Sequence, residues 1–419
     1  DLVCQSSIRQ VNRMKLYIIK FAASPSAGRL EHVLDRAVSS LDIPVVTEYI
    51  TSTEQFSDLA DKGKLQSSRL IFAVETDISG INPEACKLLR YLRLKSIYPA
   101  APCGDLPSVT AAAVNGRRDG AFSSGTADIS SSGYGVLPDT ENLILSGAAG
   151  GIIVDGQCDL FTKDLGRRLA FTANLAGCNF PGKPLSEATS DLRNFRVLAG
   201  IWQTDCYEAY VRSCTLLLQK VLNFRLPVQD HPLILAVHAS NRRTSNSLAL
   251  WEMTSAHLAG KADIEVISIR NGQLWDCRGC KYEECLHFGE KGDCFYGGVM
   301  VEKVYPAIVR SDVLVLICPN YNDSVSANMM AFINRLTAVF RARDFSRKRV
   351  YAVIVSGYSG GDIVAQQIIG AINMNKNLIL PGNFALMTTA NDPGEALDLP
   401  GIKAQTAAFA RRILIDGAG

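Results

Sequence analysis

The sequence has almost no excess of charge of either sign. Its 43 lysines and arginines are balanced by 41 aspartates and glutamates, which gives a formal net charge of +2 over 419 residues. Proteins that bind nucleic acid or the surface of a membrane usually carry a basic excess. We therefore expect neither nucleic acid nor a membrane among the partners.

Long apolar runs are also missing. The best runs, such as Val313–Ile317, have the length of a strand and polar flanks, whereas a spanning helix needs about 20 apolar residues. Asp1 to Ser7 are polar and lack the core of a signal peptide, and Met14 is a candidate natural start. These features predict a cytoplasmic protein, whose 12 cysteines should be thiols or metal ligands rather than disulfides.

Histidine is scarce, with five in the chain. No pattern joins a nucleophile to a base, and no pair of carboxylates has the spacing of an acid–base couple. His238 and His257 fall in a predicted strand and a predicted helix, so we interpret them as structural. We expect no side chain to act as an obligatory acid or base.

The C-terminal half alternates short apolar runs with helical patterns. Apolar residues from Met329 to Phe340 recur at helical spacing, and a last helix is expected from Ile402 to Ile415. Nearly continuous apolar runs are typical of parallel strands that are buried on both faces. The five predicted strands are Leu233–Val237, Ile264–Ser268, Val313–Ile317, Val350–Val355 and Phe384–Thr388. This order predicts a doubly wound α/β sheet that binds ligands beyond the carboxyl ends of its strands.

The N-terminal half resembles a degenerate copy of the same plan. Its segments 16–24, 70–74 and 146–154 align with segments 233–240, 313–317 and 356–364. The third pair shares the pattern Ser-Gly-x-x-Gly-Gly-x-Ile-Val, which favours a duplication over two unrelated α/β domains. A Pro/Ser/Gly-rich stretch from Leu106 to Pro138 predicts a long surface loop. A helix from Asp205 to Asn223 and a linker over 226–232 place the boundary between domains 1–226 and 227–419.

Three loops of the second half could hold a ligand at one edge of the sheet. The first, Ala239 to Ser247, joins a buried strand to a helix N-terminus, where free N–H groups suit a phosphate; its serines could equally be caps. The second, Cys318 to Ser326, contains Pro319 and Tyr321, which suit a planar ring, although it could be an ordinary polar loop. The third, Ser356 to Gly361, is glycine-rich and allows close approach of the backbone, or is only a flexible turn.

At these residues the second half resembles the flavodoxin-like NAD(P)H-dependent FMN reductases, and within them the iron–sulfur flavoprotein branch. Ala239 to Ser247 is similar to the family's phosphate loop, Pro319-Asn320-Tyr321 to its ring loop, and Asn334-Arg335 stands where a helix usually ends in Asp-Arg. The resemblance covers 233–415 and implies one bound FMN. It implies phosphate contacts from Ser240, Arg242, Thr244, Ser245, Asn246 and Ser247. It implies ring contacts from Pro319, Asn320, Tyr321, Asn322, Ser356, Gly357 and Tyr358.

Four cysteines lie close together at Cys277, Cys280, Cys285 and Cys294. Such a set can hold a [4Fe–4S] cluster or a tetrahedral zinc, or it can consist of plain or redox-active thiols. The branch that the chain resembles has such a window in the same region, with tighter spacing between the second and third cysteines. Here Glu283 and Glu284 fall in that interval and are unfavourable neighbours for an anionic cluster. A cluster, zinc and free thiols all remain open at this stage.

The first half does not keep the flavin signals. Leu30 and Glu31 take the positions of Asn246 and Ser247, and Thr76 to Ile78 takes the place of the ring loop. We therefore expect the first half to bind no cofactor. Since relatives of this kind commonly dimerise near the flavin, our hypothesis is that it acts as a built-in partner, with Asn179 to Lys183 as candidate substrate contacts. The chain would then be a monomer with an internal pseudo-dimer, or a homodimer.

The leading hypothesis is an FMN-dependent oxidoreductase. It would pass electrons from NAD(P)H or a ferredoxin-like donor to a small acceptor such as a quinone, a nitro or azo compound, or an activated alkene. One alternative is an FMN/iron–sulfur electron carrier without a small-molecule substrate of its own. Another is a thiol-based redox sensor or interaction protein on a degenerate flavodoxin-like fold.

Overall fold

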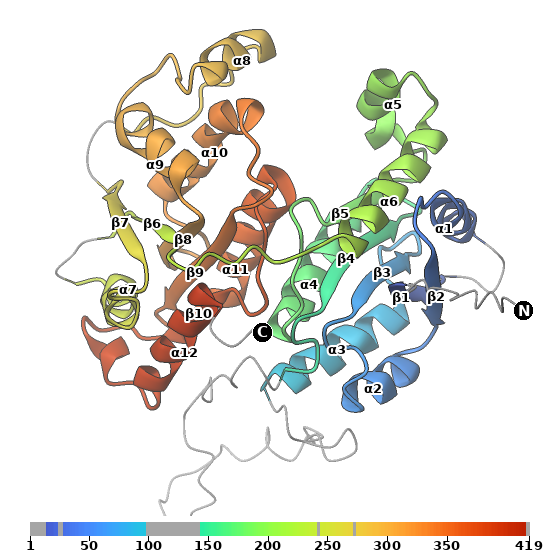
Figure 1. The fold of residues 1–419 in the computed structure, drawn as a ribbon, viewed down its shortest axis with the longest axis horizontal. Helices are drawn as coiled ribbons and strands as arrows, with labels where there is room; N and C mark the ends of the chain where they lie inside the picture. Colours follow the sequence, from blue (N-terminus) through green and yellow to red (C-terminus); the bar gives the residue numbers. More distant parts are fainter. Residues whose placement is uncertain (1–13, 24–27, 98–142, 241–243, 271–273, 416–419) are drawn as a thin grey trace, which may run out of the picture.

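The computed structural model describes residues 14–23, 28–97, 143–240, 244–270 and 274–415. Its strands form two five-stranded sheets, one in each half of the chain (Figure 1). The first contains β1 Met14–Phe21, β2 Val45–Ile50, β3 Arg69–Glu75, β4 Ala149–Asp155 and β5 Leu185–Ala188. The second contains β6 Leu233–His238, β7 Asp263–Ser268, β8 Val313–Pro319, β9 Arg349–Ser356 and β10 Ala385–Thr389. The predicted loop 106–138 lies outside the described residues.

Helices cover both faces of each sheet. The first half has α1 Arg29–Ser39, α2 Thr53–Asp61, α3 Pro83–Ile97, α4 Thr162–Leu175, η3 Arg193–Phe195, α5 Arg196–Trp202 and α6 Cys206–Leu222. The second has α7 Asn246–Ala256, α8 Tyr282–Glu290, η4 Met300–Val304, α9 Tyr305–Arg310, α10 Ala327–Ala342, α11 Gly361–Ile368, η5 Ile369–Met374, η6 Glu395–Leu397 and α12 Ile402–Leu414. Across the described ranges, no helix has both the length and the apolar character needed to cross a membrane.

The two sheets have the same topology. Their strand orders are β2-β1-β3-β4-β5 and β7-β6-β8-β9-β10, and all neighbouring strands are parallel. This is the doubly wound 2-1-3-4-5 order of flavodoxin-like domains. The interior strands β4 and β9 are buried along their whole length, because helices pack on both faces. The predicted fold, two tandem flavodoxin-like domains, is confirmed.

The five strands predicted in the second half are present, with ends that differ by one or two residues. The periodic helix is also confirmed, because Met329, Phe332, Ile333, Leu336 and Val339 all lie on the buried face of α10.

Two of the three alignments between the halves hold. Strands β1 and β6 occupy the same place in their sheets, and β3 corresponds to β8, since each pairs with the first strand of its own half. The third alignment is wrong. Segment 146–154 runs into strand β4, whereas segment 356–364 is the end of β9, a turn and the start of α11. The true counterpart of β4 is β9.

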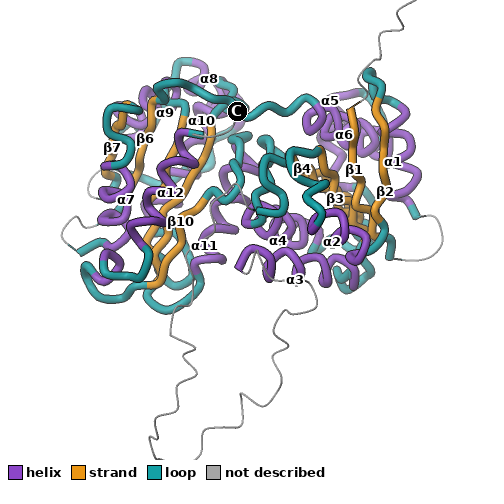
Figure 2. The backbone as a smooth tube through the Cα atoms, turned by 60° about the horizontal axis from the view of Figure 1, so that its bottom comes forward, coloured by secondary structure: helices purple, strands orange, loops and turns teal. Residues whose placement is uncertain are grey.

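The halves are joined by a seam between α4 and α11, which lie at the centre of the molecule (Figure 2). We use "seam" for segments 176–184 and 375–384 together with these two helices. Phe180 and Leu380 form an antiparallel bridge, with reciprocal backbone hydrogen bonds of 2.8 and 2.9 Å. Residues of both halves, including Leu169 and Ile368, belong to one hydrophobic core.

Hydrogen bonds across the seam come in matching pairs. The Lys183 N–H donates to the carbonyl of Asn373 at 2.9 Å, and the Asn383 N–H donates to the carbonyl of Asn174 at 2.7 Å. Each of Asn174 and Asn373 also donates its side-chain amide to a proline carbonyl of the opposite half, at 2.7 and 3.0 Å. A self-complementary pattern of this kind is what a two-fold dimer interface shows, here within one chain.

Candidate functional site

The three ligand loops predicted from the sequence meet at one edge of the second sheet. Strands β6, β8 and β9 are adjacent and parallel, so the loops that follow them lie side by side at the carboxyl edge. The strand order reverses between β6 and β8, and such a switch point is where open α/β sheets bind ligands.

The first loop carries three serines around the N-terminus of α7. The Ser240 N–H donates to Nδ1 of the buried His238 at 3.3 Å. Ser245 is the N-cap, and its hydroxyl accepts the Leu248 N–H at 3.2 Å and lies 3.0 Å from the hydroxyl of Ser247. The first N–H groups of α7 point out of the helix end, as in any α-helix. Thr244 is exposed, and the predicted Arg242 lies outside the described residues.

The side chain of Asn246 makes its hydrogen bonds to the loop after β10. Its Nδ2 donates to the carbonyl of Asp392 at 2.8 Å, and its Oδ1 accepts the N–H of Gly394 at 2.8 Å. Asn246 therefore ties α7 to the loop that follows β10, and only its backbone N–H remains for a phosphate. Sequence reasoning missed the loop after β10 as a partner of Asn246, because the two lie about 150 residues apart in the chain.

The second loop is a two-residue hairpin. Tyr321 and Ser324 exchange backbone hydrogen bonds of 3.0 and 3.1 Å. Asn322 and Asp323 between them have φ of 53° and 56°, which is the left-handed geometry of a type I′ turn. Asparagine and aspartate tolerate this geometry better than most residues, so the turn explains their presence. It leaves the Tyr321 ring 54% exposed.

Asn320 connects the second loop to the third. Its Nδ2 donates to the Ser356 hydroxyl at 3.2 Å and to the carbonyl of Ser359 at 2.9 Å. Gly360, with φ of +86°, lies against the second loop, and the position requires glycine because a Cβ there would lie 1.9 Å from Oδ1 of Asp323. The ring of Tyr358 stands 84% exposed at the same edge.

The loop after β10 completes this edge. The Ala390 N–H donates to the carbonyl of Ser356 at 2.9 Å, and Oδ1 of Asn391 lies 3.0 Å from where a Cβ on Gly357 would be. The four loops are thus bonded to one another, which gives a preorganised edge.

Three buried polar atoms at this edge have no hydrogen-bond partner among the described residues. They are Oγ of Ser240, Oδ1 of Asn320 and Oγ1 of Thr388, at the ends of β6, β8 and β10. Buried polar atoms are nearly always satisfied in proteins, so these three suit a polar ligand. Thr388 is a candidate that sequence reasoning missed, because its strand was predicted but the last residues were not considered as ligands.

In the first half, a carboxylate lies at the corresponding edge. The Ala23 N–H, directly after β1, donates to Oε2 of Glu75 at 3.1 Å. Gly28 lies so close that a Cβ there would be 2.0 Å from Oε1 of the same carboxylate. Glu75 is 92% buried and therefore brings a negative charge of the chain itself to the place where a phosphate would bind.

An ion pair fills the neighbouring space. The predicted match of Leu30 to Asn246 is wrong by one residue, because Arg29 is the first residue of α1 as Asn246 is of α7. The Nη2 atom of Arg29 lies 2.6 Å from Oδ1 of Asp155. Arg29 also donates to the carbonyls of Thr189 and Ser190 at 2.9 and 2.8 Å. Burial alone would lower the pKa of Arg29, but the hydrogen bond and charge of Asp155 raise it overall. These contacts support the prediction that the first half holds no cofactor.

The four cysteines lie on an arm, residues 274–299, which runs along α10 and back. Helix α8 of the arm packs on α10, and three residues of α10 donate side-chain hydrogen bonds to the arm. Asn334 donates to Oδ1 of Asp276 at 3.0 Å, Arg335 donates to the carbonyl of Gly297 at 2.9 Å, and Arg341 donates to the carbonyl of Tyr282 at 3.3 Å. The arm is therefore anchored, although most of its residues are exposed.

All four thiols are free, with Cys277 and Cys280 exposed and Cys285 and Cys294 half-buried. Burial raises the pKa of Cys285, the charge of Arg341 lowers it, and the charges of the other three thiols raise it further. In the part of the chain that the structure describes, no group of three or more His, Cys, Asp or Glu side chains is arranged so that it could hold a metal ion. Arg335, which donates to the arm at the carbonyl of Gly297, is 2% exposed, and its Nε and Nη1 have no partner among the described residues.

The candidate substrate contacts 179–183 do not lie near these loops. They belong to the seam, beside the first residues of β4 and β9. Strand β9 has eight residues, about 23 Å at roughly 3.3 Å per residue, so the seam segments and the ligand loops lie at opposite edges of the sheet. This hypothesis is wrong for these residues.

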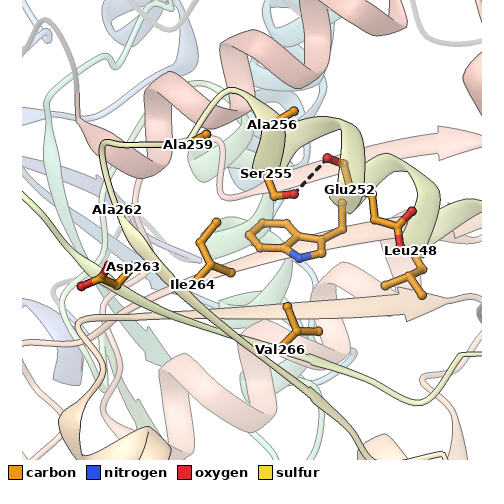
Figure 3. Close-up of a pocket in the computed structure, with 10 residues that line it drawn as sticks. Leu248, Glu252, Ser255, Ala256, Ala259, Ala262, Asp263, Ile264 and Val266 are labelled. Carbon is orange, nitrogen blue, oxygen red and sulfur yellow. Dashed lines mark hydrogen bonds between the residues drawn. The ribbon is translucent and has the colours of Figure 1, made fainter.

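A surface groove lies elsewhere, between α7 and the edge strand β7 (Figure 3). It encloses about 520 Å³ and is lined by Trp251, Ile264 and Val266, with Glu252 and Asp263 at its sides. It does not include the loops at the carboxyl edge.

Comparison with known proteins identifies the second half. Residues 232–392 match the sequence model of the family described as NADPH-dependent FMN reductase. Over these residues the chain is therefore similar to the NADPH-dependent FMN reductases. The match confirms the predicted family for the C-terminal half and, with it, the predicted class of enzyme, an FMN-dependent NAD(P)H oxidoreductase.

The similar solved structures are distant from this chain in sequence. An NAD(P)H:quinone oxidoreductase from Methanothermobacter marburgensis is 14% identical, over 45% of this chain and 98% of that one, with a TM-score of 0.33. An azoreductase from Bacillus anthracis str. Sterne is 13% identical, over 44% and 98%, with a TM-score of 0.31. No curated protein matches the chain.

Proposed function

We propose that this protein passes electrons from NAD(P)H, through FMN bound at the carboxyl edge of the second sheet, to a small acceptor. Quinones, nitro or azo compounds and activated alkenes are the acceptor classes. The observation that carries the proposal is the coincidence of the family match over 232–392 with three unpartnered buried polar atoms at that edge.

The residues at the edge fit FMN. The N-terminus of α7, with Ser240, Thr244, Ser245 and Ser247, offers hydroxyl and N–H donors to a phosphate, and Arg242 would add charge. The hairpin of Tyr321 and the third loop would hold the ring. Bound FMN would supply the redox chemistry, by accepting a hydride and returning two electrons. The chain binds, orients and shields it.

We further propose that domain 227–419 holds the only FMN and that domain 1–226 is its built-in partner. The carboxylate of Glu75 and the pair Arg29–Asp155 occupy the carboxyl edge of the first sheet. They leave little space for a second phosphate, and the positive charge of Arg29 is already paired with Asp155. The seam, with its paired hydrogen bonds, takes the surface that a second copy would use. A monomeric chain follows from this arrangement.

The purified protein should be yellow and contain one FMN per chain. Absorbance and extracted flavin measure the stoichiometry, and consumption of NADH or NADPH with a benzoquinone, a nitroarene, an azo dye and an enone measures turnover. We expect at least one acceptor to be reduced at a rate that saturates. Two FMN per chain would contradict the assignment of the first half, and a colourless protein that FMN cannot reconstitute would overturn the proposal.

A second candidate is an FMN/iron–sulfur electron carrier that exchanges electrons with a ferredoxin-like partner. The observation that favours it is Arg335, a buried cation with unpartnered N–H groups beside the cysteine arm. In the described residues the four thiols are not arranged to hold a metal, so Cys277, Cys280, Cys285 and Cys294 would have to move together to bind a [4Fe–4S] cluster. Such a cluster would carry negative charge that the cation would balance.

Iron and sulfide assays of anaerobically purified protein test this candidate. About four iron and four sulfide per chain, lost together in a Cys294→Ala variant, would support the cluster. A matched Cys206→Ala variant, at a half-buried thiol of the first half, should keep them. If the wild-type protein contains FMN but no iron, the cluster is excluded and the FMN-dependent oxidoreductase remains as the proposed function.

A further inference from the structure

The loop that contains the Tyr321–Ser324 hairpin is bound by Gln367, a residue that no sequence motif indicates. Gln367, on α11, accepts the N–H of Val325 at 3.0 Å and donates through Nε2 to the Ser324 hydroxyl at 3.1 Å. Ser324 is the closing residue of the hairpin that exposes Tyr321. One side chain therefore fixes the far end of the loop at two adjacent positions.

The helix that carries Gln367 is fixed by the first half. It packs on α4 and continues into the π-helical turn η5, whose Asn373 binds the segment 181–183 across the seam. At Gly370, between them, a Cβ would lie 3.6 Å from Cδ of Arg167 in α4. The position of Gln367 thus depends on contacts from both halves.

The hairpin has few other tethers. Asn320, at its start, is bonded to the third loop, but its turn residues Asn322 and Asp323 are exposed. Without Gln367, the hydroxyl of Ser324 and the N–H of Val325 would have to bond to water. Val325 is buried, so that change would move the loop.

We propose that Gln367 is a positioning residue for the flavin ring: it sets the place of the Tyr321 hairpin, and through α11 it makes the ring site depend on the first half of the chain. This inference rests on the proposed binding of FMN. It assigns to the cofactor-free half a role at the active site that does not require any of its residues to touch the flavin.

The test compares Gln367→Ala with Gln366→Ala in the full chain. Gln366 is the neighbouring, equally half-buried residue, and its amide only reaches the carbonyl of Asp362 within the same helix. We expect Gln367→Ala to weaken FMN binding about tenfold, the effect of losing one to two net hydrogen bonds. It should also change the visible circular dichroism of the bound flavin, which a general loss of stability would not do.

A Gln367→Glu variant provides the rescue, because a carboxylate still accepts the Val325 N–H and the Ser324 hydroxyl. Its flavin dichroism should stay near that of the wild type, as should the thermal unfolding of all three apo variants. If Gln367→Ala and Gln366→Ala give the same flavin dichroism and FMN affinity, the inference is overturned while the proposed function stands. A wild-type chain that binds no FMN overturns both.

Discussion

Replacement of Ser245 by aspartate is expected to reduce FMN affinity by at least about 100-fold. Ser245 caps α7 by accepting the Leu248 N–H, and aspartate is an equally good cap, so the helix should persist. The new carboxylate would face the phosphate dianion. Two unit charges about 4 Å apart near a protein surface repel by about 4 kcal/mol, which salt screening reduces. Titration of the apo protein with FMN, followed by fluorescence, gives the dissociation constant.

Ser52→Asp is the matched control. Ser52 caps α2 in the first half, where its hydroxyl accepts the Gln55 N–H at 3.2 Å, and this substitution should leave FMN affinity unchanged. Retention of wild-type affinity by Ser245→Asp would show that no phosphate binds at the end of α7. The phosphate site proposed there would then be wrong.

Gly382→Ala is expected to destabilise the protein by about 1–3 kcal/mol, as overpacking of a tight contact does. A Cβ on Gly382 would lie 2.3 Å from the carbonyl oxygen of Gly177 across the seam, so the two segments would have to separate. Their paired hydrogen bonds would lengthen with them. Denaturant unfolding followed by circular dichroism measures the loss.

Gly200→Ala provides the comparison, since a Cβ there meets nothing within 4 Å. Alanine in place of that glycine in α5 should stabilise the helix slightly, by about 0.5–1 kcal/mol. A Gly382→Ala protein as stable as the wild type would mean that the seam is not closely packed in solution.

The strands of the second half could be predicted because a buried parallel strand is a short, almost wholly apolar run. The three ligand loops followed from them, since parallel strands send their loops to one edge. The hydrogen bonds between those loops could not be predicted. Asn246 looked like a phosphate ligand because its partners, Asp392 and Gly394, are remote in sequence and bind it through their backbones, which leave no residue signature.

The incorrect third alignment has a physical cause. Gly150 and Gly151 lie in strand β4, where neighbouring side chains leave no space for a Cβ. A Cβ on Gly150 would lie 2.7 Å from the ring of Phe180. Gly360, by contrast, is needed for a turn with positive φ. The same residue type thus serves packing in one half and backbone conformation in the other, and the sequence pattern does not distinguish them.

The seam did leave a signal that was not recognised. Pro-Gly follows Phe180 in one half and Leu380 in the other, and these two residues form the bridge between the halves. A Pro-Gly pair is typical of an exposed turn, so the segment 179–183 taken alone does not indicate a buried interface. Its burial depends on the matching turn in the other half, which a local reading does not reveal.

The paired contacts of the seam have a consequence for how such a protein can change by mutation. In a dimer of identical subunits, every substitution appears on both sides of the axis, so a residue cannot be lost from one cofactor site and retained in the other. With both sides encoded separately, Arg29 can stand where the other half keeps Asn246 while Asn174 and Asn373 are both retained. Because the two halves are encoded separately, their cofactor sites can differ in sequence while the contacts of the seam stay symmetric. Each half can therefore acquire its own function.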